Sequence, residues 1–581
     1  MRFPMSRSRS RLARLAVVAG GLAIASLIVA ALVAARTDAL TPREQALHVL
    51  NRLSFGPRPG DVDRVARMGV SAYVEEQLHP ERIPDGPVEE RLSSGYPTLA
   101  MSNAQLIARF EEPLRAARKK LKAERANMEP GPTAADAGEA DPPAGDLQKL
   151  RDLIPPDQRP RRILDELTAA RILRATESER QLNEVMVDFW MNHFNVYANK
   201  GQDRFAIVSF ERDTIRPHIW GTFEELLQAT AKSPAMLFYL DNARSVADAE
   251  NRPAVPAARA ARVANPNAPR GLNENYAREL MELHTLGVDG GYTQRDVTEL
   301  ARILTGWSIG LPRREGAQAA AGGRGFGRGR GAMMRSAETP GEFVFRAAAH
   351  DAGTKTLLGV PFAPNGIAEG ERAIAMLAHH PATAHHIAYQ LCQRIVADEP
   401  PKELVDRIAR RFLANGGDLR DTVRAIVTSP EFFDPQYYRS KIKSPFEYVV
   451  SALRAVGGAT DGRAIASKIA EMGEPLYLCQ PPTGYSDTAD AWVSSGALLA
   501  RLNFALALAQ GRLAGTTADP GIVKLAGASP GRGVDSAAHW LIGTDISEGT
   551  LATITQRVAE DGSGETLVAG LLLGSPEFQK Q

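Results

Sequence analysis

Length, composition and charge limit the class of this protein. The chain has 581 residues, which is ample for a large hydrophobic core. Residues 1–36 hold six arginines and no acid, so residues 37–581 keep 63 basic against 68 acidic side chains, a net charge of about −5. A nucleic-acid-binding domain normally has a strong basic bias, so this balance excludes a general nucleic-acid binder.

The first 36 residues have the pattern of an export signal. Five arginines between Arg2 and Arg14 precede an uncharged run from Leu15 to Ala35. This run is longer than the core of a secretory signal, about 7–15 residues, and matches the roughly 20 residues that cross a bilayer. We therefore expect an N-terminal apolar helix that anchors the chain in the inner membrane, whereas the small residues up to Ala35 leave cleavage open. In either case the rest of the chain faces the periplasm or the exterior.

Helical signals dominate residues 41–581. Thr41-Pro42-Arg43-Glu44 is a capping box with proline at the first helical position, and similar starts recur at Ser233-Pro234, Thr293 and Ser444-Pro445. Strand-like alternation is scarce, and residues 342–345 are the best candidate. These patterns predict a mainly α fold, with one large multi-helix domain over residues 41–581 and a very short β element.

Three stretches of biased composition interrupt the helical pattern. They are rich in proline, alanine, glycine and charged residues, and we expect them to be disordered insertions near residues 115–160, 248–270 and 312–340. The two cysteines, Cys392 and Cys479, allow at most one disulfide, and two free buried thiols fit the sequence equally well.

The densest group of polar residues lies between Asn273 and Asp296. Asn275, Glu279 and Glu282 have the spacing of one helix face, so the two glutamates can project into a cleft as metal ligands or as an acid/base pair, followed by His284. The alternative is a salt-bridged amphipathic helix, because Glu274, Arg278 and Glu282 have the i,i+4 spacing of ion pairs. Both interpretations stay open from the sequence.

Other histidines are further candidates. His193 lies among aromatic residues in the segment 188–195, where it can be a ligand, a base or a packing residue. His350 and Asp351 follow the strand candidate, and such a pair can orient an imidazole or bind a cation. Four histidines fall within residues 379–386, a density typical of metal sites, but Pro381 splits the run.

Several long motifs resemble one family. They occur in the family's order from about residue 42 to the C-terminus, and include Asn51-Arg-Leu-Ser-Phe-Gly-Pro57, Phe189-Trp-Met-Asn-His-Phe194, Asn273-Glu-Asn-Tyr-Ala-Arg-Glu-Leu280, Leu304-Thr-Gly-Trp307, Lys443-Ser-Pro-Phe446 and Pro482-Thr-Gly-Tyr485. The chain is similar in these residues to the bacterial domain of unknown function 1800 family. The resemblance implies a single exported α-rich domain. It also implies a partner from the domain of unknown function 1501 family, whose members resemble sulfatases. It implies no established activity.

Two functions are compatible with these observations. The first is an exported binding or assembly factor that works with a partner hydrolase. The second is a metal-assisted hydrolase that uses Glu279, Glu282, His284 and His193 as catalytic residues. In that case the ligands of a divalent metal would come from His193, Glu279, Glu282, His350 and Asp351.

Overall fold

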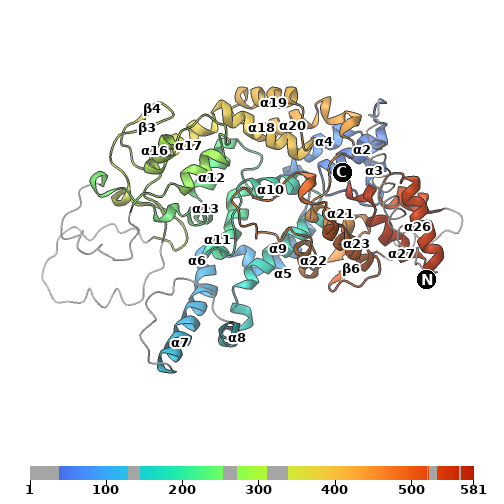
Figure 1. The fold of residues 1–581 in the computed structure, drawn as a ribbon, viewed down its shortest axis with the longest axis horizontal. Coiled ribbons are helices and arrows are strands. Elements are labelled where there is room, and N and C mark those ends of the chain that lie inside the picture. Colours follow the sequence, from blue (N-terminus) through green and yellow to red (C-terminus); the bar gives the residue numbers. More distant parts are fainter. Residues whose placement is uncertain are drawn as a thin grey trace, which may run out of the picture.

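The computed structural model describes residues 38–128, 144–252, 271–310, 338–519, 521, 533–561 and 564–581. This part of the chain is mainly helical (Figure 1), which confirms the predicted fold class. The predicted N-terminal apolar helix, within residues 1–36, lies outside the described residues. Within the described ranges, none of the helices is both long enough and apolar enough to cross a membrane.

The N-terminal half forms a series of mostly short helices. They are α2 (Pro42–Arg52), α3 (Asp61–Met68), α4 (Val70–Gln77), α5 (Gly86–Gly95), α6 (Asn103–Leu106), α7 (Glu112–Met128), α8 (Ala144–Leu153), α9 (Arg161–Glu177), α10 (Gln181–His193), α11 (Asp203–Ser209), α12 (Phe223–Lys232) and α13 (Pro234–Tyr239).

The C-terminal half continues in the same way. Its helices are α15 (Asn275–Glu282), α16 (Gln294–Ile303), α17 (Ile367–Ala378), α18 (Pro381–Ile395), α19 (Lys402–Ala414), α20 (Leu419–Val427), α21 (Pro445–Ala455), α22 (Arg463–Glu471), α23 (Ser495–Ala509), α25 (Gly533–Leu541), α26 (Glu548–Asp561), α27 (Glu565–Leu573) and α28 (Pro576–Gln579).

Local capping chemistry explains where several of these helices begin. The side chains of Thr41, Thr293 and Ser444 each accept a hydrogen bond from the backbone three residues later, and each forms the predicted capping box. Helix α13 begins at Pro234 as predicted, although the Ser233 side chain makes no capping hydrogen bond. Proline at the first helical position suits α2, α13 and α21, because the N–H that proline lacks would be unpaired there.

The β structure consists of more than the single predicted element. Residues 343–345, within the predicted strand, form β2 (Phe343–Phe345), which pairs antiparallel with β1 (Trp307–Ile309). Two further antiparallel pairs join β3 (Lys355–Leu357) with β4 (Val360–Phe362) and β5 (Ala459–Thr460) with β6 (Thr516–Thr517). The prediction of one β element was therefore incomplete. Strands of two or three residues are too short to show an alternating pattern.

The first predicted insertion, residues 115–160, contains two packed helices. Helices α7 and α8 project together from the rest of the molecule (Figure 1). They share a small core separate from the main one, made of Ala117, Leu121, Leu150 and Ile154. Residues 129–143, and most of the predicted insertions 248–270 and 312–340, lie outside the described residues.

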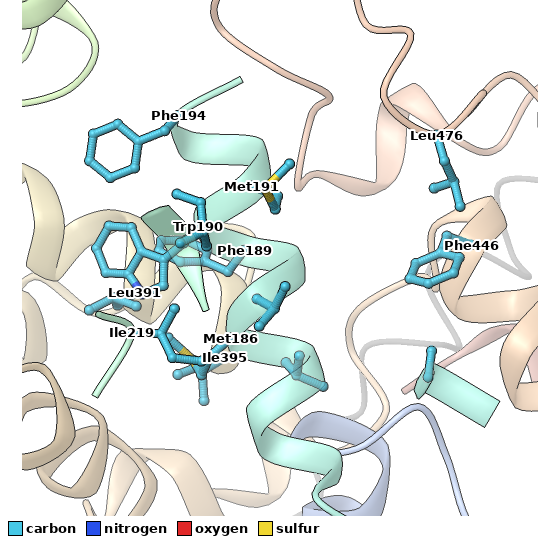
Figure 2. Close-up of a cluster of buried hydrophobic side chains, with 14 of the residues drawn as sticks. Met186, Phe189, Trp190, Met191, Phe194, Ile219, Leu391, Ile395, Phe446 and Leu476 are labelled. Atoms are coloured by element: carbon cyan, nitrogen blue, oxygen red, sulfur yellow. The ribbon is translucent and has the colours of Figure 1, made fainter. Parts of the chain in front are cut away.

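Helix α10 lies inside the main hydrophobic core. Its Trp190 and Phe194 are fully buried, and Met191 lies on the side of α10 that faces Phe446 and Leu476 (Figure 2). Burying an aromatic side chain of this size contributes a few kcal/mol, so the core fixes α10 in place. The polar residues interspersed along α10 are therefore held in defined positions.

Both cysteines are free and buried, Cys392 in α18 and Cys479 in the segment after α22. The structure thus decides between the two interpretations that the sequence left open. Burial raises the pKa of the Cys392 thiol to about 12 and that of Cys479 to about 11. Both thiols are consequently neutral and unreactive at ordinary pH.

Candidate functional site

Asn192, near the end of α10, clamps the turn that carries the motif of residues 482–485. Its side-chain amide donates to the Tyr485 carbonyl (2.8 Å) and accepts from the Tyr485 backbone N–H (2.7 Å). Gly484 has φ 72°, and a Cβ there would lie 2.5 Å from Asn192. Only glycine fits this close approach, so the two motifs are matched to one another.

Asn195 holds the preceding part of the same segment. Its side-chain amide donates to the carbonyl oxygens of Cys479 (3.0 Å) and Pro481 (2.7 Å). Two asparagines of one motif thus fix residues 479–485 against α10. The polar residues on either side of His193 therefore position backbone, a role that their spacing in the sequence did not reveal.

His193 is a buried packing residue. Its Nδ1 donates to Oε1 of Gln390 (2.7 Å), and its Nε2 lies 3.3 Å from the carbonyl oxygen of His284. The ring also packs edge-on against Trp190 and Phe194, with centroids 5.3 Å and 4.5 Å away. Burial, together with two neighbouring histidines, holds the pKa of His193 well below its ordinary value. The ring is accordingly neutral at physiological pH.

His284 and His386 complete a cluster of three imidazoles. The His193 centroid lies 6.0 Å from that of His284 and 6.4 Å from that of His386. His284 is 1% exposed, and its Nε2 has no hydrogen-bond partner in the described part of the chain. His386 Nε2 lies 3.1 Å from the Leu283 carbonyl oxygen. His386 belongs to the histidine run of residues 379–386, but its contact with His193 was not predicted, because only the folded structure brings the two histidines together.

Protonation of His284 is expected to destabilise the protein in acid. Burial and His386 lower its pKa from 6.5 to about 3, so its contribution to stability is present above pH 6.5 and is lost as the pH falls towards 3. Between pH 6.5 and pH 3 the free energy of unfolding of His284→Leu should therefore fall by up to about 1.4 kcal/mol less per pH unit than that of the wild type. Urea unfolding between pH 7 and pH 4 measures the slope. The exposed His385→Leu is the control, and equal slopes for wild type and His284→Leu would contradict the prediction.

Glu279 and Glu282 lie on α15 and are both partly exposed. In the described residues neither carboxylate forms an ion pair, and Glu282 accepts only a long hydrogen bond from the Tyr292 hydroxyl (3.4 Å). Burial and the charge of Glu282 raise the pKa of Glu279 above its ordinary value. The two carboxylates thus form an acidic pair without a neutralising cation.

The predicted ion-pair ladder on α15 is only half formed. Arg278 lies 3.6 Å from Glu274, as the spacing predicts. Its guanidinium then turns away from Glu282 and donates to Gln294 (2.8 Å) on the next helix. The tertiary contact with α16 leaves Glu282 without the expected partner.

His350 and Asp351 belong to a separate buried network. His350 Nε2 lies 3.0 Å from Glu369, and Lys355 donates to the other oxygen of Glu369 (2.7 Å). Asp351 accepts two hydrogen bonds from Arg302, at 2.9 Å and 3.1 Å. The cations and carboxylates of this network pair with one another, so removing one partner would leave a buried charge unpaired.

A metal centre does not emerge from these candidates. Over the residues that the structure describes, no group of three or more His, Cys, Asp or Glu side chains is placed to hold a metal ion. The ring nitrogens of His193 instead face Gln390 and the His284 carbonyl oxygen, and Nε2 of His350 faces Glu369. The five predicted ligands, His193, Glu279, Glu282, His350 and Asp351, are thus distributed over three separate surroundings.

A small cavity lies on the other side of α10. It has a volume of about 40 Å³, and its wall includes residues from three of the motifs quoted above: Phe189, Met191, Asn192, Ser444 and Tyr485. Leu476 also lines the cavity, and Figure 2 shows it on the side of α10 that carries Met191. Motifs separated by nearly three hundred residues therefore meet at one place.

Charged side chains line the same cavity. The Arg394 guanidinium lies 3.0 Å from Asp188, 3.2 Å from Asp487 and 2.8 Å from Glu447, which stands just behind the wall. Arg171 donates to the other oxygen of Asp188. Sequence reasoning missed these residues, because nothing in their local pattern distinguishes them from surface charges.

Glu474 is the remaining acid of the cavity wall. Its side chain accepts a hydrogen bond from the Phe446 backbone N–H (2.7 Å) at the start of α21. Burial, followed by the nearby charge of Asp188, raises the pKa of Glu474 to about 8. Its carboxyl group is therefore protonated at neutral pH. Asp188, by contrast, binds two arginines.

The comparison with known proteins identifies a family but no characterised relative. No curated protein and no solved structure matches the chain significantly. The family model described as "Protein of unknown function (DUF1800)" matches residues 48–580, which includes every residue of the sites described above. The chain therefore belongs to the DUF1800 family, as its motifs predicted.

Proposed function

We propose that the protein is an exported cell-envelope factor that binds a partner protein, and that Glu279 and Glu282 form part of its binding surface. One observation carries the proposal: these two carboxylates are partly exposed and lack ion pairs in the described residues, whereas the other candidate groups are engaged in internal contacts. An acidic pair of this kind favours a basic segment on the partner, with an affinity that falls as salt increases.

The partner we propose is a sulfatase-like protein of the domain of unknown function 1501 family. The support is the resemblance of the chain to a family often encoded beside such proteins. Export is supported by the arginine-flanked apolar run of residues 15–35, which would place the folded part on the periplasmic side, anchored or released.

Metal-assisted hydrolysis by Glu279, Glu282 and His284 has less support. The His284 ring is buried against Phe194, with centroids 5.1 Å apart, whereas the two carboxylates are partly exposed. A catalytic base must come within hydrogen-bond reach of the reacting water, which favours an accessible nitrogen. The hypothesis stays a prediction that metal analysis of the purified protein decides.

Fractionation of the native organism tests the proposal. The tagged full chain should be found in the envelope fraction together with the sulfatase-like protein, identified by mass spectrometry. The double variant Glu279→Gln/Glu282→Gln should remain in that fraction but bind the purified partner at least tenfold more weakly at low salt. Glu403→Gln, an exposed carboxylate on α19, is the matched control.

Two results would contradict different parts of the proposal. Equal affinity of the double variant and the wild type would exclude the α15 carboxylates as the binding surface. A cytoplasmic location, or no binding of the purified partner by wild-type protein, would exclude the function itself.

A further inference from the structure

We propose that the cavity beside α10 binds one protonated primary amine, held by the carboxyl groups of Glu474, Asp188 and Asp487. The inference goes beyond the proposed partner binding, because it concerns a different site, whose wall contains neither Glu279 nor Glu282. It rests on the size of the cavity, on the balance of charges around it and on the rigidity of its wall.

The cavity has the size of an amine head group. A buried water needs roughly 10–15 Å³ of such space, so a volume of about 40 Å³ holds about three waters, or an ammonium group with its first methylene. Ser486 lines the cavity and is exposed, so the site is reached from solvent at this turn. Larger ligands would have to leave their remaining atoms outside.

The charges of the wall leave one carboxyl group without a cation. Three acids line the cavity, Asp188, Glu474 and Asp487, against the two guanidinium groups of Arg171 and Arg394. Both guanidinium groups bind Asp188, and Arg394 also binds Asp487. Glu474 forms no ion pair in the described ranges of the chain. When Glu474 is ionised, one additional positive charge would therefore balance the site.

Other charged groups near Glu474 are already engaged. Glu447, at the start of α21, is held by Arg394 and accepts from the Ser444 backbone N–H (2.8 Å). Arg501 on α23 donates to the Lys443 carbonyl oxygen (2.8 Å) and to Gln579 (3.3 Å). Glu447 is itself an acid, and Arg501 cannot move to neutralise Glu474 without losing its contacts. Lys441, the cation beside Asp487, is held by Asp398 and by the Asp487 carbonyl oxygen (2.9 Å). A cation for an ionised Glu474 must therefore come from outside the wall.

The arrangement of the carboxyl groups around the cavity favours an amine over a metal ion. An ammonium group has three N–H donors and needs separate acceptors around it, whereas a divalent metal needs several oxygens at about 2.0–2.6 Å from one point. The described residues offer no such metal-type group. Asp188, Glu474 and Asp487 line the cavity from three different segments: α10, the stretch after α22 and the turn before α23 respectively.

Hydrogen bonds hold the segments of the cavity wall in this arrangement. Asn192 clamps Tyr485 through two hydrogen bonds, and the Tyr485 hydroxyl donates to the Pro475 carbonyl oxygen (2.8 Å). The segment that carries Glu474 is thus joined to the turn that precedes Asp487. A preorganised site of this kind loses little entropy when a ligand binds.

When the amine binds, its ammonium group replaces the proton carried by Glu474. In the empty site Glu474 carries a proton on its carboxyl group. When the ammonium group enters, the O–H bond of Glu474 breaks, the proton leaves to solvent, and the carboxylate accepts an N–H of the ligand. The ligand keeps all its protons, so one proton is released for each amine bound near pH 6.5.

Calorimetry with methylammonium chloride tests the site on the full chain. Titrations at pH 6.5 in buffers of different ionisation enthalpy should show saturable binding with about one proton released per site. Glu474→Gln should weaken binding at least tenfold and abolish proton release, whereas Glu403→Gln should behave as wild type. Glucosamine and an N-α-acetyllysine amide then show whether the amine is that of a sugar or of a side chain.

Several results would overturn the proposal. These are no saturable binding of methylammonium to the wild type, equal binding by Glu474→Gln, binding without proton release, or stronger competition by Mg²⁺ than by ammonium. If Glu474→Gln fails to fold, Ser486→Trp takes its place, because it blocks the mouth and leaves the buried charges intact. Unchanged methylammonium binding by a folded Ser486→Trp would then exclude the cavity.

Discussion

Replacing Glu474 by glutamine is expected to leave the stability at pH 5 nearly unchanged and to raise the free energy of unfolding at pH 9. The folded protein holds the pKa of Glu474 at about 8, against an ordinary value of 4.5. The stability that this group contributes is therefore fully present below pH 4.5 and is lost as the pH rises through 8. A shift of this size corresponds to at most roughly 4–5 kcal/mol. Glutamine stays neutral and can still accept from the Phe446 N–H.

Urea unfolding of wild type and Glu474→Gln at pH 5, 7 and 9 measures this effect. The difference in free energy between the two proteins should grow with pH in favour of the variant. Glu403→Gln should show no such trend, because its carboxyl group is exposed. A difference that stays constant from pH 5 to pH 9 would mean that Glu474 is ionised in the folded state throughout.

Replacing Arg394 by methionine is expected to destabilise the protein by about 3–5 kcal/mol at pH 7. The Arg394 side chain is only 9% exposed and contacts Asp188, Glu447 and Asp487. Methionine fills much of the same volume but leaves three carboxylates with too few cations in a poorly solvated place. The loss should decrease towards pH 4, because the carboxyl groups then take up protons and no longer repel one another.

Thermal and urea unfolding at pH 7 and pH 4 test this second effect. Arg411→Met is the matched control, because Arg411 also forms a short ion pair, with Asp421 at 2.7 Å, but its side chain is 54% exposed. Surface pairs of this kind contribute about 0–1 kcal/mol. A cost for Arg394→Met as small as that of the control would show that the network does not need its central cation.

The elements of the fold that the sequence predicted are those specified within one helical turn. The capping boxes at Thr41, Thr293 and Ser444 have the predicted hydrogen bonds, because each involves only residues three apart. The strand at residues 343–345 was also predicted, but its partner strand of residues 307–309 was not. The pairing joins segments separated by an insertion, and three residues carry no periodic signal.

In the candidate site, too, local features were predicted from the sequence, whereas the contacts between distant segments were not. The polar face of α15 was predicted from spacing, yet the contact of Arg278 with Gln294 on α16 decided that Glu282 has no cation. The sequence left His193 open as a ligand, a base or a packing residue. The contacts of its ring nitrogens with Gln390 and with the His284 carbonyl oxygen depend on α18 and on the segment after α15, which lie far along the chain.

By itself the sequence determined the helical class, the family membership and many helix starts, because propensity, capping and motif order are written in neighbouring residues. It also carries the arginine-flanked apolar segment, from which export remains a prediction. Only the tertiary structure decided which charges are buried together. Asp188, Arg394, Glu474 and Asp487 look like ordinary surface residues in the sequence, and they become a cavity wall because helix packing brings them out of water and next to one another. Burial and charge pairing are properties of that packing, and local patterns do not contain them.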